Sequence, residues 1–104
     1  AWNLVLNTYR NTNVIKYKKI KDIKLKYLID LSLSYNQLTS LPTSIGNLQN
    51  LTYLYLNNNQ LTSLPTSIGN LQNLTELYLY GNQLTSLQKN KIKEMFKNTK
   101  TKVY

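Results

Sequence analysis

A leucine pattern that returns every 23 residues constrains the fold of this chain more than any other feature. The first copy contains Leu28, Leu31, Leu33, Asn36, Leu38 and Leu41. The same residue types recur one and two periods later, so each copy reads L-x-x-L-x-L-x-x-N-x-L-x-x-L. The first two copies then continue as P-x-x-I-G-x-L. A unit of constant length repeated in tandem predicts a solenoid, in which each unit packs mainly against its neighbours.

The spacing within one copy predicts the path of the chain. The two leucines of L-x-L lie two residues apart, which is the side-chain period of a β-strand, so both point to one side. A single strand cannot bury that side, but parallel copies share an apolar interior. The amide of the Asn that follows the strand can bond to backbone groups in the turn. The Leu-Pro step then favours an extended corner, from which the chain returns along a short helical or irregular turn.

With this pattern the chain resembles the leucine-rich-repeat family over residues 28–87. The resemblance implies an α/β fold: a short right-handed horseshoe segment of a solenoid, with a parallel sheet on its concave side and short helical or irregular turns on its convex side. Most members of the family bind ligands, usually proteins. The LPxxIGxL version is similar to units of many bacterial and protist proteins and of intracellular eukaryotic scaffolds.

The repeats divide the chain, which we expect to form one domain, into three parts. Residues 28–87 hold three repeats, and residues 88–104 form a C-terminal cap that closes the open end of the stack. In the cap, Ile92, Met95 and Phe96 follow helical spacing, and residues 100–104 favour a short final strand. Residues 1–27 are either an N-terminal cap or a degenerate first repeat.

The residues between the strand leucines are expected to project from the concave sheet. If the first Leu of a unit is position 1, the outward positions are 3, 5, 7 and 8. Tyr, Ser and Asn, which dominate these positions, are also the residue types enriched in antibody binding sites. Aromatic neighbours on adjacent strands also stabilise a sheet, and both roles can hold together. The predicted protein-binding residues are Asp30, Ser32, Ser34, Tyr35, Tyr53, Tyr55, Asn57, Asn58, Glu76, Tyr78 and Tyr80.

Two neighbouring copies differ only at these outward positions. Residues 37–59 and 60–82 are identical at 20 of 23 positions. The differences are Tyr53 against Glu76, Asn57 against Tyr80, and Asn58 against Gly81. Neutral drift at exposed sites is one explanation. We favour diversification for binding, because the exposed parts of the return turns are unchanged.

Composition excludes several classes of function. The chain has no Cys and no His, which removes the Ser-His and Cys-His catalytic arrangements and the usual zinc and haem ligands. Its four acidic residues are too scattered for a carboxylate metal site. We therefore expect a protein that is not an enzyme, with no catalytic residue, no metal and no cofactor. No run of apolar residues is long enough to span a bilayer.

The charge of +9 lies at the two ends of the chain. Residues 1–26 carry a net +6, residues 27–88 carry −2, and residues 89–104 carry +5. One interpretation is a site for nucleic acid, another anionic polymer or an anionic membrane surface. We favour the other, in which lysines protect exposed edges from strand-to-strand association. No nucleic-acid motif accompanies them, so nucleic acid is the less favoured partner.

Two further expectations concern assembly and location. Three repeats are close to the smallest number that makes a stable stack, so a homodimer or end-to-end association is an alternative function. Extracellular members of the family usually carry cysteine-stapled caps, which this chain lacks. We therefore expect a cytoplasmic protein, or a bacterial secreted or surface protein, rather than a eukaryotic extracellular one.

Overall fold

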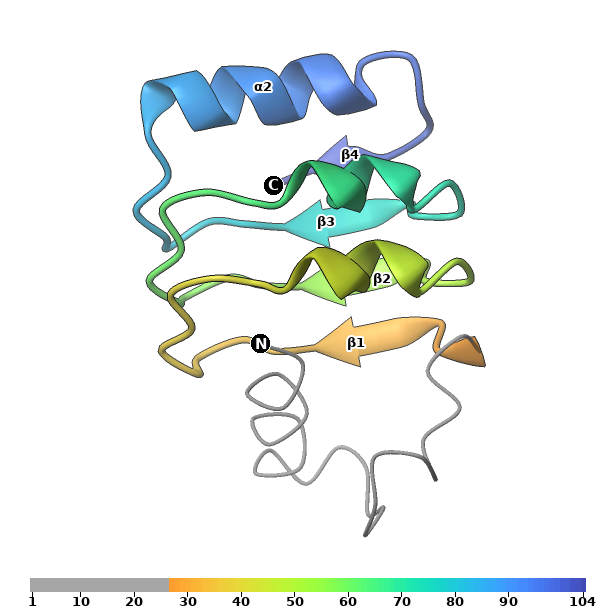
Figure 1. Ribbon diagram of the computed structural model, residues 1–104, viewed down its shortest axis with the longest axis horizontal. Helices are drawn as coiled ribbons and strands as arrows, with labels where there is room; N and C mark the ends of the chain where they lie inside the picture. Colours follow the sequence, from red (N-terminus) through yellow and green to blue (C-terminus); the bar gives the residue numbers. More distant parts are fainter. Residues whose placement is uncertain (1–26) are drawn as a thin grey trace, which may run out of the picture.

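Residues 27–104, which the computed structural model describes, form a stack of repeats with a parallel sheet of four strands along one side (Figure 1). The strands, in spatial order, are β1 (Asp30–Ser32), β2 (Tyr53–Tyr55), β3 (Glu76–Tyr78) and β4 (Lys102–Val103). The chain returns between them through the 3-10 helices η3 (Thr43–Asn47) and η4 (Thr66–Asn70), and then through helix α2 (Ser86–Phe96). The predicted N-terminal cap or degenerate repeat lies, apart from Tyr27, outside the described residues.

The 23-residue period sets the register of the sheet. Leu31 in β1 lies opposite Leu54 in β2, which in turn lies opposite Leu77 in β3. Equal positions of successive repeats are therefore direct neighbours, and each outward position forms a row across the sheet. The parallel sheet, the short helical turns and the final helix and strand confirm the predicted solenoid.

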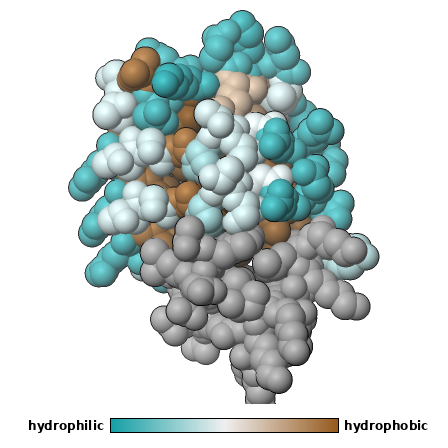
Figure 2. Space-filling model, viewed as in Figure 1, coloured by the Kyte–Doolittle hydropathy of each residue, from teal (hydrophilic) through white to brown (hydrophobic). Residues whose placement is uncertain are grey.

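Repeat leucines and isoleucines fill the space between the sheet and the return turns, where burial of their apolar surface stabilises the stack. The turns cover this core with polar groups: Figure 2 shows hydrophilic or neutral atoms over most of the described part, with hydrophobic atoms mainly in the gaps between them. The buried core consists of Leu31, Leu33, Leu38, Leu41, Ile45, Leu48, Leu51, Leu54, Leu56, Leu61, Leu64, Ile68, Leu71, Leu74, Leu77, Leu79, Ile92 and Phe96.

Leu87 is the most exposed of the repeat leucines. Its side chain is 64% exposed, whereas Leu64 at the same repeat position is 8% exposed. The cause is the next residue. Proline after Leu64 keeps that leucine extended, but Gln88 follows Leu87 and lets α2 begin at Ser86. Leu87 thus lies on the first turn of a helix instead of at an extended corner.

The repeat asparagines bond to backbone groups of the turn, as the sequence predicts, and Asn59 and Asn82 also join successive units. Asn59 is buried, and its Nδ2 donates to the carbonyl oxygens of Leu33 and Leu56 at 2.9 and 3.0 Å. Its Oδ1 accepts from the amides of Asn36 and Leu38 at 2.9 and 3.0 Å. One side chain therefore satisfies buried backbone groups of its own repeat and of the one before it.

The C-terminal segment covers the last repeat. Thr85 caps α2, because its side-chain oxygen accepts from the amide of Gln88 at 3.1 Å. The helix buries Ile92 and Phe96, and Met95 packs half-buried beside them. It begins two residues before the predicted segment of 88–104, and the exact boundary between repeats and cap remains a prediction. β4 then pairs in parallel with β3.

Gly46 and Gly69 stand at the same place in two identical T-S-I-G-N segments but meet different neighbours. A Cβ atom on Gly46 would lie 2.5 Å from the backbone oxygen of Ser67 in the next turn. On Gly69 it would lie 3.0 Å from Cγ and Sδ of Met95, in a flexible side chain. The backbones of η3 and η4 therefore approach closely at Gly46.

Gly46→Ala is expected to lower the free energy of unfolding by about 1–3 kcal/mol, because the methyl group must push two backbones apart. Gly69→Ala is the matched control, and we expect a change below about 1 kcal/mol because Met95 can shift. Urea unfolding followed by circular dichroism measures both values. Equal losses in the two variants would contradict the close approach at Gly46.

Candidate functional site

Tyrosine side chains gather on the face of the sheet opposite the leucine core. The register places Tyr55 beside Tyr78, with ring centroids 4.8 Å apart and planes inclined by 8°. Tyr104, just after β4, stacks on Tyr78 at 4.8 Å and 16°. Tyr80 meets Tyr78 edge-on, at 6.5 Å and 83°. We call these four residues the tyrosine cluster, and the side of the sheet that carries them the sheet face.

Stacking decides which atoms a ligand meets on this face. Tyr78 lies between Tyr55 and Tyr104, so both of its ring faces are covered, and a ligand can reach only the part of its ring edge that Tyr80 leaves free. Tyr55 and Tyr78 are half-buried, while Tyr80 and Tyr104 are exposed. Stacked and edge-on aromatic pairs each add about 0.5–1.5 kcal/mol beyond the effect of buried area. The rings are thus ordered before any ligand arrives, with apolar bodies and polar tips.

Two carboxylates shape the electrostatics of the cluster. The hydroxyl of Tyr78 donates to Oε1 of Glu76 at 2.9 Å. This hydrogen bond is the main cause that raises the pKa of Tyr78 from its ordinary 10.0 to about 12, and desolvation acts in the same direction. Desolvation is the main cause that raises the pKa of Tyr55, and the charges of Asp30 and Glu76 add to it. Both hydroxyls therefore remain neutral at physiological pH.

We expect Tyr78 to ionise near pH 12. Its pKa is higher in the folded than in the unfolded chain, so the folded state binds more protons between pH 10 and 12, and stability falls as pH rises through that window. Glu76→Gln removes the charged acceptor and is expected to lower the pKa of Tyr78. An NMR titration of the Tyr78 Cζ resonance, assigned with Tyr78→Phe, measures this. An unchanged pKa in Glu76→Gln would show that the carboxylate does not control it.

The remaining predicted residues lie around the tyrosine cluster. Asp30 is exposed at the β1 end of its row, whose other members are Tyr53 and Glu76. Ser32 continues the row of Tyr55 and Tyr78. The half-buried side chains among the predicted residues, besides those of the cluster, are Ser32, Ser34, Tyr53, Asn58 and Glu76.

Asn57 does not project into solvent, and the prediction that it is an outward residue is wrong. Its side chain is 5% exposed, and its Oδ1 accepts from Oγ of Ser34 at 2.8 Å. Asn57 lies in the middle of its row, between Ser34 and Tyr80, and its short side chain bonds sideways to Ser34. Tyr80, which has a much longer side chain at the same repeat position, is exposed.

Position 8 adopts an unusual backbone conformation in all three repeats. Tyr35, Asn58 and Gly81 have φ angles of 59°, 60° and 74°, in the left-handed region. Asn and Gly are the residues that tolerate this region best, so the change from Asn58 to Gly81 is explained by backbone geometry. The presence of Asn58 and Gly81 at equal positions of two repeats is the sequence feature that indicates this left-handed turn.

Tyr104 is the residue of this face that the sequence analysis missed. The segment 100–104 was predicted as a strand, but nothing in the repeat period gives the register of a strand outside the repeats. The structure pairs Leu77 with Val103, which places Tyr104 in the row of Tyr55 and Tyr78. Its ring stacks on that of Tyr78 and is the third ring of the stack that begins at Tyr55.

Other kinds of site are missing from the described part of the chain. Among residues 27–104, no group of three or more His, Cys, Asp or Glu side chains could hold a metal ion. Within the same range no helix is long and apolar enough to cross a membrane.

Comparisons with known proteins place the chain by its repeats. A family model described as a leucine-rich repeat region matches residues 4–100. A solved structure of a leucine-rich-repeat protein from Leptospira interrogans is similar over 70% of this chain, with 41% sequence identity and a TM-score of 0.66. The match spans 18% of that longer protein. No curated protein matches the chain. The chain therefore belongs to the leucine-rich-repeat proteins.

Proposed function

We propose that this protein binds a partner protein through the sheet face. Members of the leucine-rich-repeat family are typically non-enzymatic binding modules, usually for proteins. The observation that carries the proposal is the tyrosine cluster, in which three stacked rings and one edge-on ring hold one another in place on the sheet face. Tyrosines ordered in advance lose little entropy when a partner binds, which favours affinity.

The conformation of Tyr35 adds a second argument. Its side chain is 75% exposed, and its φ of 59° lies where a residue with a Cβ atom is disfavoured by about 1–2 kcal/mol. Asn58 and Gly81 show that this position accepts residues that relieve the strain. A large, exposed and strained aromatic at this place is costly for stability alone, which supports a role in binding.

We propose that the binding residues act together as one surface. Tyr55 and Tyr78 lie at its centre, where the energetically dominant contacts of interfaces tend to cluster. Asp30, Tyr53 and Glu76 form the row on one side of them. The other proposed members are Ser32, Ser34, Tyr35, Asn58, Tyr80 and Tyr104; Asn57 acts beneath the surface by holding Ser34.

The experiment compares two double variants in the capture of proteins from a lysate of the source organism. Tyr55→Ala/Tyr78→Ala is expected to reduce capture of a specific partner at least tenfold. Thr43→Ala/Thr66→Ala is the matched control, because both threonines are exposed at equal positions of the return turns. Circular dichroism confirms that both variants fold. The proposal would be refuted if the threonine variant no longer captured the partner while the tyrosine variant still did.

A further inference from the structure

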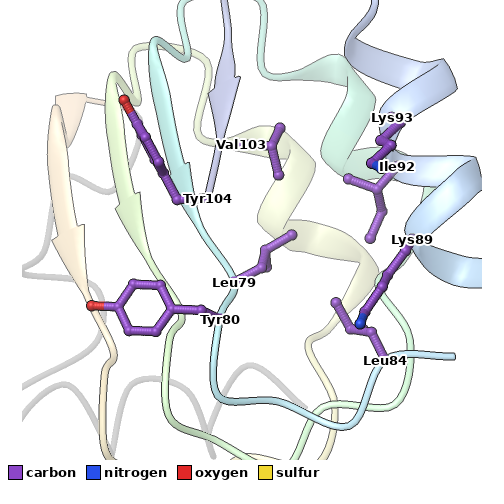
Figure 3. Close-up of a pocket in the computed structure, with 8 residues that line it drawn as sticks. All are labelled: Leu79, Tyr80, Leu84, Lys89, Ile92, Lys93, Val103 and Tyr104. Carbon is purple, nitrogen blue, oxygen red and sulfur yellow. The ribbon is translucent and has the colours of Figure 1, made fainter. Parts of the chain in front are cut away.

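The last repeat carries a pocket beside the C-terminal cap. The pocket has a volume of about 300 Å³ and lies between the end of β3, β4 and helix α2. Its apolar walls are Leu79, Leu84, Ile92 and Val103 (Figure 3). Leu38 and Leu61, which precede Leu84 at the same repeat position, are buried, but Leu84 is only half-buried. The C-terminal cap therefore leaves part of the repeat core uncovered.

Two lysines stand on the helix side of this opening. Lys89 and Lys93 are one helical turn apart on α2, and Figure 3 shows them across the pocket from Tyr80 and Tyr104. In the described part of the chain the one ion pair joins Lys97 to Glu94. Glu94 is the single acidic residue among residues 89–104, and it is therefore already engaged. An apolar pocket with a positively charged rim selects a ligand that combines a bulky apolar group with negative charge.

The pocket also adjoins the sheet face. Tyr80 and Tyr104, which line it, are members of the tyrosine cluster. A ligand lying along the sheet face can therefore place one side chain in the pocket without leaving the surface. A volume of this size is at the lower end of those of ligand sites and suits a single large side chain.

We propose that this pocket anchors an acidic segment of the partner protein, with a Trp, Phe or Leu side chain inserted between the sheet and α2 and flanking Asp or Glu side chains paired with Lys89 and Lys93. This inference rests on the proposed function and names the chemistry of its partner. A second copy of the chain is a poorer occupant, because residues 89–104 carry a net +5 and repel their counterpart.

The test uses three synthetic peptides of equal length with the full chain, monitored by NMR of methyl groups. One has Trp flanked by glutamates, one has Ala flanked by glutamates, and one has Trp flanked by lysines. We expect the first to shift the Leu84, Ile92 and Val103 methyl resonances and to bind at least tenfold more tightly than either of the others. Equal binding of the Ala peptide or the lysine peptide would overturn the proposal.

Charge-reversal variants test the rim. Lys89→Glu/Lys93→Glu is expected to weaken binding of the acidic Trp peptide at least tenfold. Lys91→Glu/Lys97→Glu changes the same charge outside the pocket, at one position of α2 and at the residue that follows it, and we expect less than a threefold effect. Equal losses in both variants would mean non-specific attraction and would overturn the proposal. Val103→Trp, which alters an exposed wall residue, is expected to fill the pocket and displace the peptide.

Two control measurements identify other occupants. Phosphatidylglycerol vesicles that shift the same methyl groups while no peptide binds would assign the pocket to lipid and overturn the proposal. If sedimentation shows a dimer, and the same methyl resonances shift when the dimer forms, the pocket is occupied by a second copy of the chain. This result would also overturn the proposal. If no peptide binds but Tyr55→Ala/Tyr78→Ala still loses its partner, the pocket assignment fails alone and the proposed function stands.

Discussion

Asn59→Ala is expected to lower the free energy of unfolding by about 3–5 kcal/mol, because it leaves several buried backbone groups without a partner. The Asn59 side chain is 6% exposed and makes four hydrogen bonds of 2.9–3.0 Å to two carbonyl oxygens and two amides. Water has little access to those groups. Since small domains are stable by only about 5–15 kcal/mol, this single change removes a large share of the total.

Asn82→Ala is the matched control for this prediction. Asn82 donates to the carbonyl oxygens of Leu56 and Leu79 at 2.9 and 2.8 Å and accepts from the amide of Leu61 at 3.0 Å. It is half-buried, so water can replace part of what is lost. We expect about half the effect of Asn59→Ala. Chemical unfolding in urea gives both values, and a loss below about 1 kcal/mol in Asn59→Ala would show that the asparagine bonds do not hold the repeats together.

Leu64→Ala is expected to cost about 2–4 kcal/mol, because it removes buried apolar surface and leaves a cavity that the stack cannot fully close. Leu87→Ala provides the comparison at the same repeat position, and we expect a change of less than about 0.5 kcal/mol because the side chain is in solvent. Thermal and urea unfolding of the two variants measure the difference.

Comparing Leu64→Ala with Leu87→Ala tests whether the backbone of the last repeat differs from that of the earlier repeats at this position. Leu64 follows an extended corner fixed by Pro65, while Leu87 begins a helix. If Leu87→Ala were as destabilising as Leu64→Ala, the helix could not begin at Ser86 as described. The variant Gln88→Pro restores the sequence of the earlier corners, and it is expected to shorten α2 at its start.

The repeat itself made most of the fold predictable from the sequence. A side-chain period of two fixed the inward leucines, and a constant unit length fixed the register of Leu31, Leu54 and Leu77. The asparagine was predictable because a buried turn must satisfy its backbone groups. These inferences depend on local geometry that every copy shares.

The residues that escaped prediction lie where the repeat ends or the strand stops. Asn57 is buried at a position predicted to be outward, because its short side chain bonds to Ser34 in the neighbouring repeat. Leu87 matches the pattern but lacks the proline that gives the pattern its corner. Tyr104 belongs to a segment without a repeat, and its register arises only when β4 pairs with β3. The pocket likewise depends on how far the cap covers Leu84, which is a matter of packing between distant segments.

The most direct test of the account is a map of where the partner touches the protein. The photoreactive residue p-benzoylphenylalanine replaces Tyr55 or Tyr80 on the sheet face, and in parallel Thr66 or Asn70 on the return turn η4. We predict that illumination in a lysate of the source organism links the same partner to positions 55 and 80 and leaves positions 66 and 70 without a specific product. Specific products at 66 and 70, with none at 55 and 80, would contradict the assignment of binding to the sheet face.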